Sequence, residues 1–135
     1  MISSPVSIVD KTNVQFDAQD CAGKRVDFLS VRNSQIKLNS CISRCYFYEC
    51  FNITVDISNA PPAGVYFENC ALIRVRATDN VLKSTTLDFT RCRDVHVDCK
   101  RKVKDIVFKL HEHDCKQVKI NDDVLPSYEY SVWEL

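Results

Sequence analysis

The side chains best suited to metal binding or nucleophilic chemistry gather in two parts of the sequence. They are His111, Glu112, His113 and Cys115 in one part, and Cys41, Cys45 and Cys50 in the other. Imidazole and thiolate groups are common zinc ligands, but neither cluster has the paired Cys-x-x-Cys spacing of structural zinc sites. We place the two histidines in a solvated insertion loop and expect no bound metal.

Candidate catalytic groups are scattered along the chain. Nucleophilic catalysis needs a thiol or hydroxyl beside a base, and most cysteines occupy positions predicted to be buried, where a thiol is unreactive. The acidic residues Asp56, Glu68 and Asp88 form no evident pair of the kind that polysaccharide lyases and hydrolases use. A Gly-x-x-x-x-Gly-Lys phosphate loop is absent. We therefore expect a binding protein with no cofactor rather than an enzyme.

An internal repeat must position these residues. From Phe47, apolar or thiol side chains recur at offsets 3, 6, 8 and 10, and Ile53, Val55 and Ile57 alternate with polar residues as in a half-buried strand. The anchors of the five copies, spaced 19, 20, 22 and 19 residues apart, are Phe28, Phe47, Phe67, Phe89 and Phe108. In the last copy four extra residues separate Phe108 from Cys115.

Repeats of this size cannot bury an apolar face alone, so neighbouring copies must stack. The segments lack helical periodicity and the leucine ladder of leucine-rich repeats. We predict an all-β fold, a right-handed parallel β-helix (β-solenoid) of about five to six coils. An antiparallel sandwich is the alternative, but Asn-Gly hairpin turns are absent.

Residues 1–135 are predicted to form a single domain. An opening strand (1–24) leads into the coils (25–120), and an extended aromatic tail (121–135) follows. The tail must cover the open end of the solenoid or pair with another chain, because the last coil otherwise exposes an unpaired edge.

Composition points to a protein of the cytosol. The chain has 18 basic and 18 acidic residues, so no overall charge attracts nucleic acid or membrane. Its start lacks a signal peptide and no apolar run could span a bilayer, so we expect the eight cysteines to stay reduced. Four of them share one repeat position, where we expect small core side chains: Cys50, Cys70, Cys92 and Cys115.

The repeat resembles the domain shared by the C-terminal region of cyclase-associated protein and by tubulin-folding cofactor C. The resemblance covers roughly residues 25–133. It lies in 46–52 (Tyr-Phe-Tyr-Glu-Cys-Phe-Asn) and 65–70 (Val-Tyr-Phe-Glu-Asn-Cys), which resemble two consecutive coils, and in 93–97 (Arg-Asp-Val-His-Val), which resembles the next. The proline-led segment from Leu125-Pro126 to Trp133 is similar to the family's C-terminal segment. The family's Lys-Ser-Ser-Glu coil and its exchanged final strand are missing.

The closer resemblance, to cyclase-associated protein, implies a cytoplasmic, cytoskeleton-associated protein. It would bind monomeric ADP-actin and assist nucleotide exchange or filament turnover, with a homodimer formed through the tail. Cofactor C implies a regulator of tubulin or a small GTPase, acting through an arginine. Asp88 stands where that arginine belongs, although Arg91 lies nearby. A purely structural scaffold is the third alternative.

We predict that the partner-binding surface is a basic edge. Its residues are Lys100, Arg101, Lys102, Lys104, Lys109, His111, Glu112, His113 and Asp114. Because corners of successive coils stack, segments 100–104 and 109–114 are expected to lie along one side of the solenoid. Positive charge there would steer an acidic protein such as actin. The second candidate surface is the exposed strand face with Tyr46, Tyr48, Tyr66 and Glu68.

Overall fold

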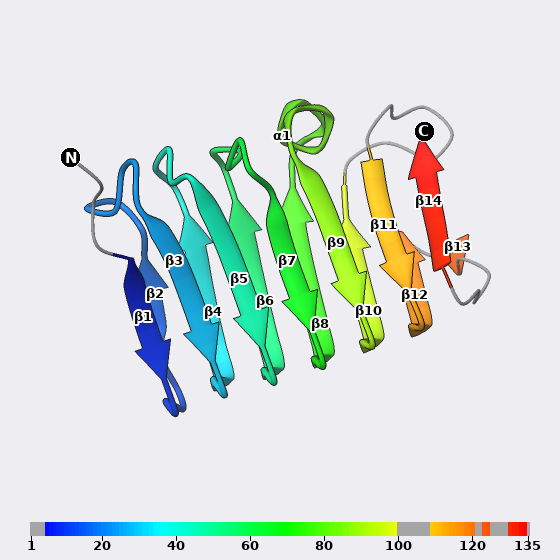
Figure 1. Ribbon diagram of the computed structural model, residues 1–135, viewed down its shortest axis with the longest axis horizontal. Helices are drawn as coiled ribbons and strands as arrows, with labels where there is room; N and C mark the ends of the chain where they lie inside the picture. The colour runs from blue at the N-terminus through cyan, green and yellow to red at the C-terminus, as the bar shows by residue number, and fades with distance from the viewer. Residues whose placement is uncertain (1–4, 100–108, 121–122, 125–129, 135) are drawn as a thin grey trace.

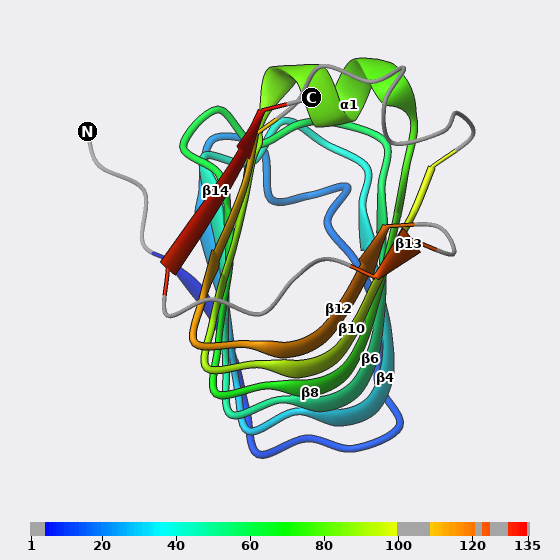
Figure 2. The same cartoon turned by 90° about the vertical axis from the view of Figure 1, so that its right-hand side faces the viewer.

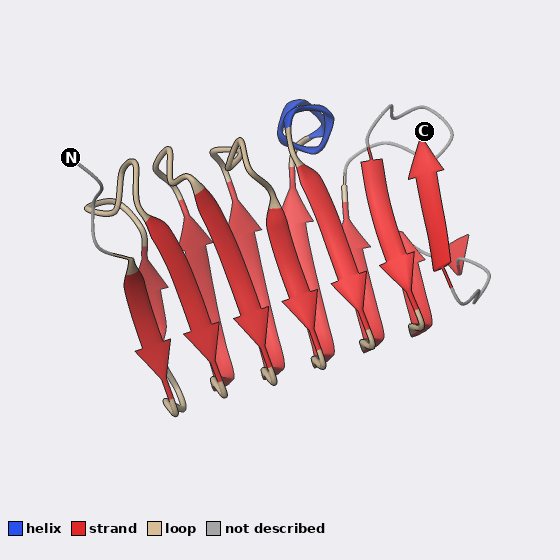
Figure 3. Ribbon diagram, viewed as in Figure 1, coloured by secondary structure: helices blue, strands red, loops and turns tan. Residues whose placement is uncertain are grey.

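The computed structural model describes residues 5–99, 109–120, 123–124 and 130–134, and these form two facing sheets (Figures 1 and 3). Sheet A contains, in spatial order, β1 (Val6–Val9), β3 (Arg25–Leu29), β5 (Arg44–Tyr48), β7 (Val65–Glu68), β9 (Thr86–Thr90), β11 (Lys109–His113) and β14 (Tyr130–Glu134). Sheet B contains β2 (Gln15–Asp17), β4 (Arg32–Leu38), β6 (Phe51–Ile57), β8 (Ala71–Ala77), β10 (Arg93–Asp98), β12 (Lys116–Ile120) and β13 (Asp123–Val124).

The chain alternates between the two sheets, and strands β1 to β12 pair with one another in parallel. Figure 2 looks along the stack and shows successive coils superimposed. The all-β parallel β-solenoid is therefore confirmed, with about five turns. The antiparallel sandwich is excluded, and the right-handed sense stays a prediction.

A ladder of aromatic rings fills the interior. Phe28, Phe47, Phe67 and Phe89 are fully buried, and successive rings stack with centroids 4.7, 4.6 and 4.8 Å apart. Parallel strands lie about 4.8 Å apart, so equal register brings each ring directly onto the next. The repeat spacing thus becomes a continuous core.

The chain bends sharply along one side of the solenoid, where each sheet A strand passes into the following sheet B strand (bottom of Figure 1). We call this side the turn edge. Each passage contains two residues with positive φ three positions apart, for example Glu49 (φ 53°) with Asn52 (φ 57°), and Asn69 (φ 53°) with Leu72 (φ 55°). Residues with a β-carbon adopt this left-handed conformation only at a cost in free energy, which glycine avoids. Because the chain has only two glycines, other residues bear that strain here.

The fifth Phe anchor was assigned incorrectly from sequence. β11 pairs with β9 so that Glu112 is in register with Phe89, and Phe108 lies outside the described residues. Glu112 precedes Cys115 by the same three residues that separate each earlier Phe from its Cys or Val. No insertion separates the anchor from Cys115, and His111 and His113 lie in strand β11 rather than in a loop.

The two ends of the chain add more strands than expected. Residues 1–24 contribute both β1 and β2, which pair with β3 and β4, instead of one opening strand. At the other end, β14 pairs antiparallel with β11, and β13 pairs antiparallel with β12. The tail therefore extends both sheets beyond the last coil.

One short helix interrupts the strands. α1 (Asp79–Ser84) begins after Thr78, whose side chain accepts a hydrogen bond from the Val81 backbone N–H. Val81 and Leu82 are buried against the core. Within the described ranges, no helix has the length and apolar character needed to cross a bilayer.

Candidate protein-binding face

The structure separates the residues predicted to form the basic edge. Lys100, Arg101, Lys102 and Lys104 lie outside the described residues. Lys109, His111, Glu112 and His113 lie on β11, and Asp114 follows it at the turn edge with φ 55°. Lys109 begins β11 and Asp114 follows its end, so these two residues lie on opposite sides of the solenoid. The predicted set therefore does not follow one edge.

The cysteine and histidine clusters do not assemble a metal site in the described ranges. No group of three or more His, Cys, Asp or Glu side chains there is arranged to hold a metal ion. Cys45 and Cys50 are buried, whereas Cys41 is exposed. Cys115 is buried and its thiol donates to the carbonyl oxygens of Phe89, at 3.2 Å, and of His113, at 3.4 Å.

Sheet A carries a face of half-buried aromatic and charged residues on its outer side, which we call the tyrosine face: Arg44, Tyr46, Tyr48, Tyr66 and Glu68. The face arises because side chains alternate across a strand: Cys45 and Phe47 point into the core, so their neighbours point outward. Parallel register then aligns Tyr46 with Tyr66 and Tyr48 with Glu68. The second candidate surface predicted from sequence is thus a continuous cluster.

Arg44 is central to the tyrosine face. Its guanidinium carbon lies 5.9 Å from the ring centroid of Tyr46 and 5.7 Å from that of Tyr66. These distances allow cation–π attraction to both rings. Its Nε is buried without a hydrogen-bond partner, and no ion pair involves Arg44 in the described part of the chain. Its positive charge is therefore available to an acidic group of a partner.

Backbone geometry holds Tyr66 in place. The Tyr66 hydroxyl donates to the Ala63 carbonyl oxygen at 2.8 Å. The ring lies over Gly64, which has φ 99°, and a Cβ at Gly64 would come within 3.0 Å of the ring. Glycine is therefore required at this position for both its conformation and its lack of a side chain.

A carboxylate connects the tyrosine face to the turn edge. Glu68 accepts hydrogen bonds from the Tyr46 hydroxyl and from Arg91 Nη2, the latter at 2.5 Å, while Arg91 Nε donates to Asn69 Oδ1 at 2.9 Å. Burial and the hydrogen bond to Glu68 raise the pKa of Tyr46. Tyr46 is thus kept protonated as a donor, and the network fixes the side chains that border the face.

Sequence reasoning named the three tyrosines and Glu68 for this face, did not name Arg44, and considered Arg91 only for the cofactor C alternative. The signal for Arg44 is its position two residues before Tyr46, which places both on the same side of a strand. The contact between Arg91 and Glu68 joins residues 23 positions apart, and only the register of β7 with β9 brings them together.

Comparisons of the chain with protein-family models, with curated proteins and with solved structures gave no match. The resemblance to cyclase-associated protein therefore stays a prediction.

Proposed function

We propose that this chain is a cytoplasmic, cytoskeleton-associated protein that binds monomeric ADP-actin and assists its nucleotide exchange or turnover. It acts by binding, without catalysis or a cofactor, and a homodimer formed through the tail belongs to the same proposal. The observation that carries the binding role is the Arg44 guanidinium, which lies against two tyrosine rings without a carboxylate partner in the described residues.

The chemistry of the tyrosine face supports a protein partner. Tyrosine and arginine are enriched among the residues that dominate binding energy in protein interfaces. Tyr46, Tyr48 and Tyr66 are only half-buried, so an interface can bury their remaining apolar area while the Tyr46 and Tyr66 hydroxyls keep their polar partners. Actin is acidic and can supply the carboxylate that Arg44 lacks. The family resemblance selects actin among acidic proteins.

The cofactor C alternative has less support from the geometry. An arginine that stabilises phosphoryl transfer must reach the nucleotide, but the Arg91 guanidinium is bound by both Glu68 and Asn69. Asp88, at the position expected for the arginine, accepts a hydrogen bond from Thr90 at 3.1 Å. A regulator of tubulin or of a small GTPase remains the second candidate.

Titration of labelled monomeric ADP-actin tests the proposal. We expect Arg44→Gln together with Tyr48→Ala to weaken binding at least tenfold, about 1.4 kcal/mol. Gln35→Ala is the matched control, because Gln35 is exposed on the outer side of sheet B. Thermal melts would verify that each variant is folded.

Two results would contradict the proposal. One is a wild-type chain that does not bind ADP-actin at tens of micromolar, or that prefers tubulin in competition. The other is a hundredfold acceleration of GTP hydrolysis that Arg91→Ala abolishes, which would favour the cofactor C alternative.

A further inference from the structure

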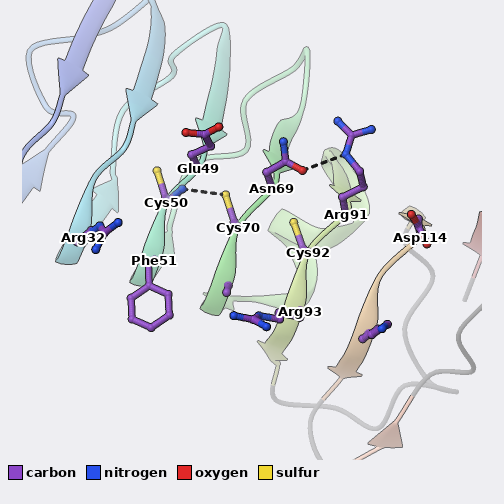
Figure 4. Close-up of a pocket in the computed structure, with 12 residues that line it drawn as sticks. Arg32, Glu49, Cys50, Phe51, Asn69, Cys70, Arg91, Cys92, Arg93 and Asp114 are labelled. Atoms are coloured by element: carbon purple, nitrogen blue, oxygen red, sulfur yellow. Dashed lines mark hydrogen bonds between the residues drawn. The ribbon is translucent and has the colours of Figure 1, made fainter.

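A groove of about 610 Å³ runs along the turn edge (Figure 4). The side chains of Val31, Cys50, Cys70, Cys92 and Cys115 form a buried column. The residue that directly follows each member of this column in the sequence contributes to one wall of the groove. In chain order this wall consists of Arg32, Phe51, Ala71, Arg93 and Lys116.

These wall residues form a single row across the strands of sheet B. Arg32 pairs in register with Phe51, Phe51 with Ala71, Ala71 with Arg93, and Arg93 with Lys116. The row therefore presents a cation, an apolar pair and two further cations along the solenoid axis. Figure 4 shows Phe51 between Arg32 and Arg93.

The three cationic side chains in the row form no ion pair with an acidic side chain within the described residues. Arg32, Arg93 and Lys116 are exposed and take part in none of the ion pairs found there. By contrast, Arg91 at the same edge is paired with Glu68. Phe51 is 39% exposed, and the small side chain of Ala71 leaves space beside its ring. The row thus combines free positive charge with accessible apolar surface.

We propose that this row binds an extended acidic peptide segment of a partner protein, with the peptide running along the solenoid axis. Parallel strands lie about 4.8 Å apart, so three steps from Arg32 to Arg93 cover about 14 Å. An extended peptide rises about 3.4 Å per residue, so residues four apart are also separated by about 14 Å and face the same side.

The preferred peptide pattern follows from this match. An acidic residue binds Arg32, an apolar residue two positions later packs on Phe51 and Ala71, and a second acidic residue two positions further binds Arg93. A third acidic residue, a further two positions along and so facing the same side, reaches Lys116. Charge-assisted hydrogen bonds to arginine supply direction, and burial of the central apolar side chain adds affinity.

The groove favours a peptide over a nucleic acid. Glu49 and Asp114 also line it, and both would repel a continuous phosphate backbone. A peptide with separated carboxylates can place neutral residues opposite these two acids. The chain's balance of 18 basic and 18 acidic residues likewise supplies no general attraction for nucleic acid.

Fluorescence anisotropy at low salt tests the proposal with a labelled ten-residue peptide containing Glu-Ser-Leu-Ser-Glu-Ser-Glu. We expect it to bind the wild type, and we expect Arg93→Glu with Lys116→Glu to weaken binding at least tenfold. Arg93→Gln is the milder variant to use if the double reversal perturbs folding, and it should weaken binding several-fold. Lys24→Glu is the control for charge reversal away from the groove, because Lys24 precedes β3 on the opposite side of the solenoid, and it should leave binding unchanged.

The spacing is tested separately from the charge. A peptide of the same composition with its three glutamates adjacent should bind at least fivefold more weakly. The proposal fails if the two peptides bind equally, if Lys24→Glu weakens binding as much as the Arg93 variants, or if no binding occurs at 1 mM peptide. It also fails if a single-stranded oligonucleotide binds this groove more tightly than the peptide. None of these outcomes depends on actin binding at the tyrosine face.

Discussion

The thiol of Cys70 accepts a hydrogen bond from the backbone N–H of Cys50, with 3.4 Å between Sγ and N. The same thiol donates to the carbonyl oxygen of Phe47 at 3.6 Å. Cys115 relates to Cys92 and Phe89 in the same way, at 3.3 and 3.2 Å. The cysteine column is therefore more than small core filling, because each thiol satisfies backbone groups of the preceding coil at the bend.

Replacement of Cys70 tests this role. Cys70→Val keeps an apolar side chain of similar size but leaves the Cys50 N–H without its acceptor, which is expected to cost about 1–3 kcal/mol of unfolding free energy. Cys70→Ser keeps a donor and an acceptor and should cost less. Urea unfolding of both variants measures the difference, and equal losses would show that volume alone matters at this position.

Alkylation distinguishes the buried thiols from the exposed one. Cys50, Cys70, Cys92 and Cys115 are each 2% exposed, whereas Cys41 is exposed. A thiol must reach the reagent as thiolate to react, so we expect rapid labelling of Cys41 and slow labelling of the other four in the folded protein. Mass spectrometry after a short iodoacetamide pulse measures this, and fast native labelling of the column would contradict its burial.

Alkaline pH should destabilise the fold. Burial raises the pKa of Cys45 well above its ordinary value. The hydrogen bond with the Cys50 thiol and burial raise the pKa of Cys70 to about 12, whereas the same hydrogen bond lowers the pKa of Cys50 and offsets part of the effect of Cys70. The unfolded chain releases these protons near pH 9 while the folded chain retains them. Stability is therefore complete below pH 9 and falls as the pH rises toward 12, by up to about 1.4 kcal/mol per pH unit for each thiol.

Urea midpoints at pH 7.5, 9 and 10.5 measure this dependence. Cys45→Val is the informative variant, because Val26 and Val65 occupy the same register position in the adjacent coils. It should remain folded at pH 7.5 and lose less stability between pH 9 and 10.5 than the wild type. An identical pH dependence would assign the alkaline loss to other groups.

The sequence predicted the fold correctly where side-chain type and spacing repeat together. Phe and Cys three residues apart, followed by an alternating strand, identify the coils from Phe28 to Cys92. The prediction was wrong at Phe108 because an aromatic side chain was given more weight than the constant spacing to Cys115, which selects Glu112. The first coil was missed because Ile8 replaces the aromatic anchor, although it is in register with Phe28.

The candidate site was harder to predict, because it depends on contacts between coils. Alternation along β5 is enough to place Tyr46 and Tyr48 outside the core. The cation–π position of Arg44 over Tyr66, and the row that brings Arg32 to Arg93, follow from register between strands about 20 residues apart in sequence. A basic run in the sequence does not carry that information.

Leu72 is expected to be a site of backbone strain. It has φ 55° and is 45% exposed, although a β-carbon makes this conformation cost about 1–2 kcal/mol. Asn52, one coil earlier at the same position of the bend, has φ 57° and donates to Asn33 at 2.9 Å. Leu72→Asn should therefore raise the unfolding free energy by about 0.5–1 kcal/mol. Asn52→Leu is the reverse control and should lower it, as measured by thermal melts.

Charge reversal at Lys102 and Lys104 separates the basic run from the tyrosine face as the actin-binding surface. These lysines lie outside the described residues, so their part in binding rests on the sequence alone. If the run steers an acidic partner, Lys102→Glu with Lys104→Glu should weaken ADP-actin binding at least tenfold at low salt, about 1.4 kcal/mol. Long-range attraction acts mainly on the association rate and is screened by salt, so the loss should shrink at high salt while thermal stability stays nearly unchanged.

Arg44→Gln with Tyr48→Ala gives the contrasting pattern. Removal of direct contacts acts mainly on the dissociation rate, so its effect should persist at high salt. Stopped-flow association and dissociation rates at two salt concentrations separate the two cases. If the lysine double variant binds like the wild type at low salt, the run is ordinary surface and actin binding must depend on the tyrosine face. If only the lysine variant loses binding, the tyrosine face is not the contact surface.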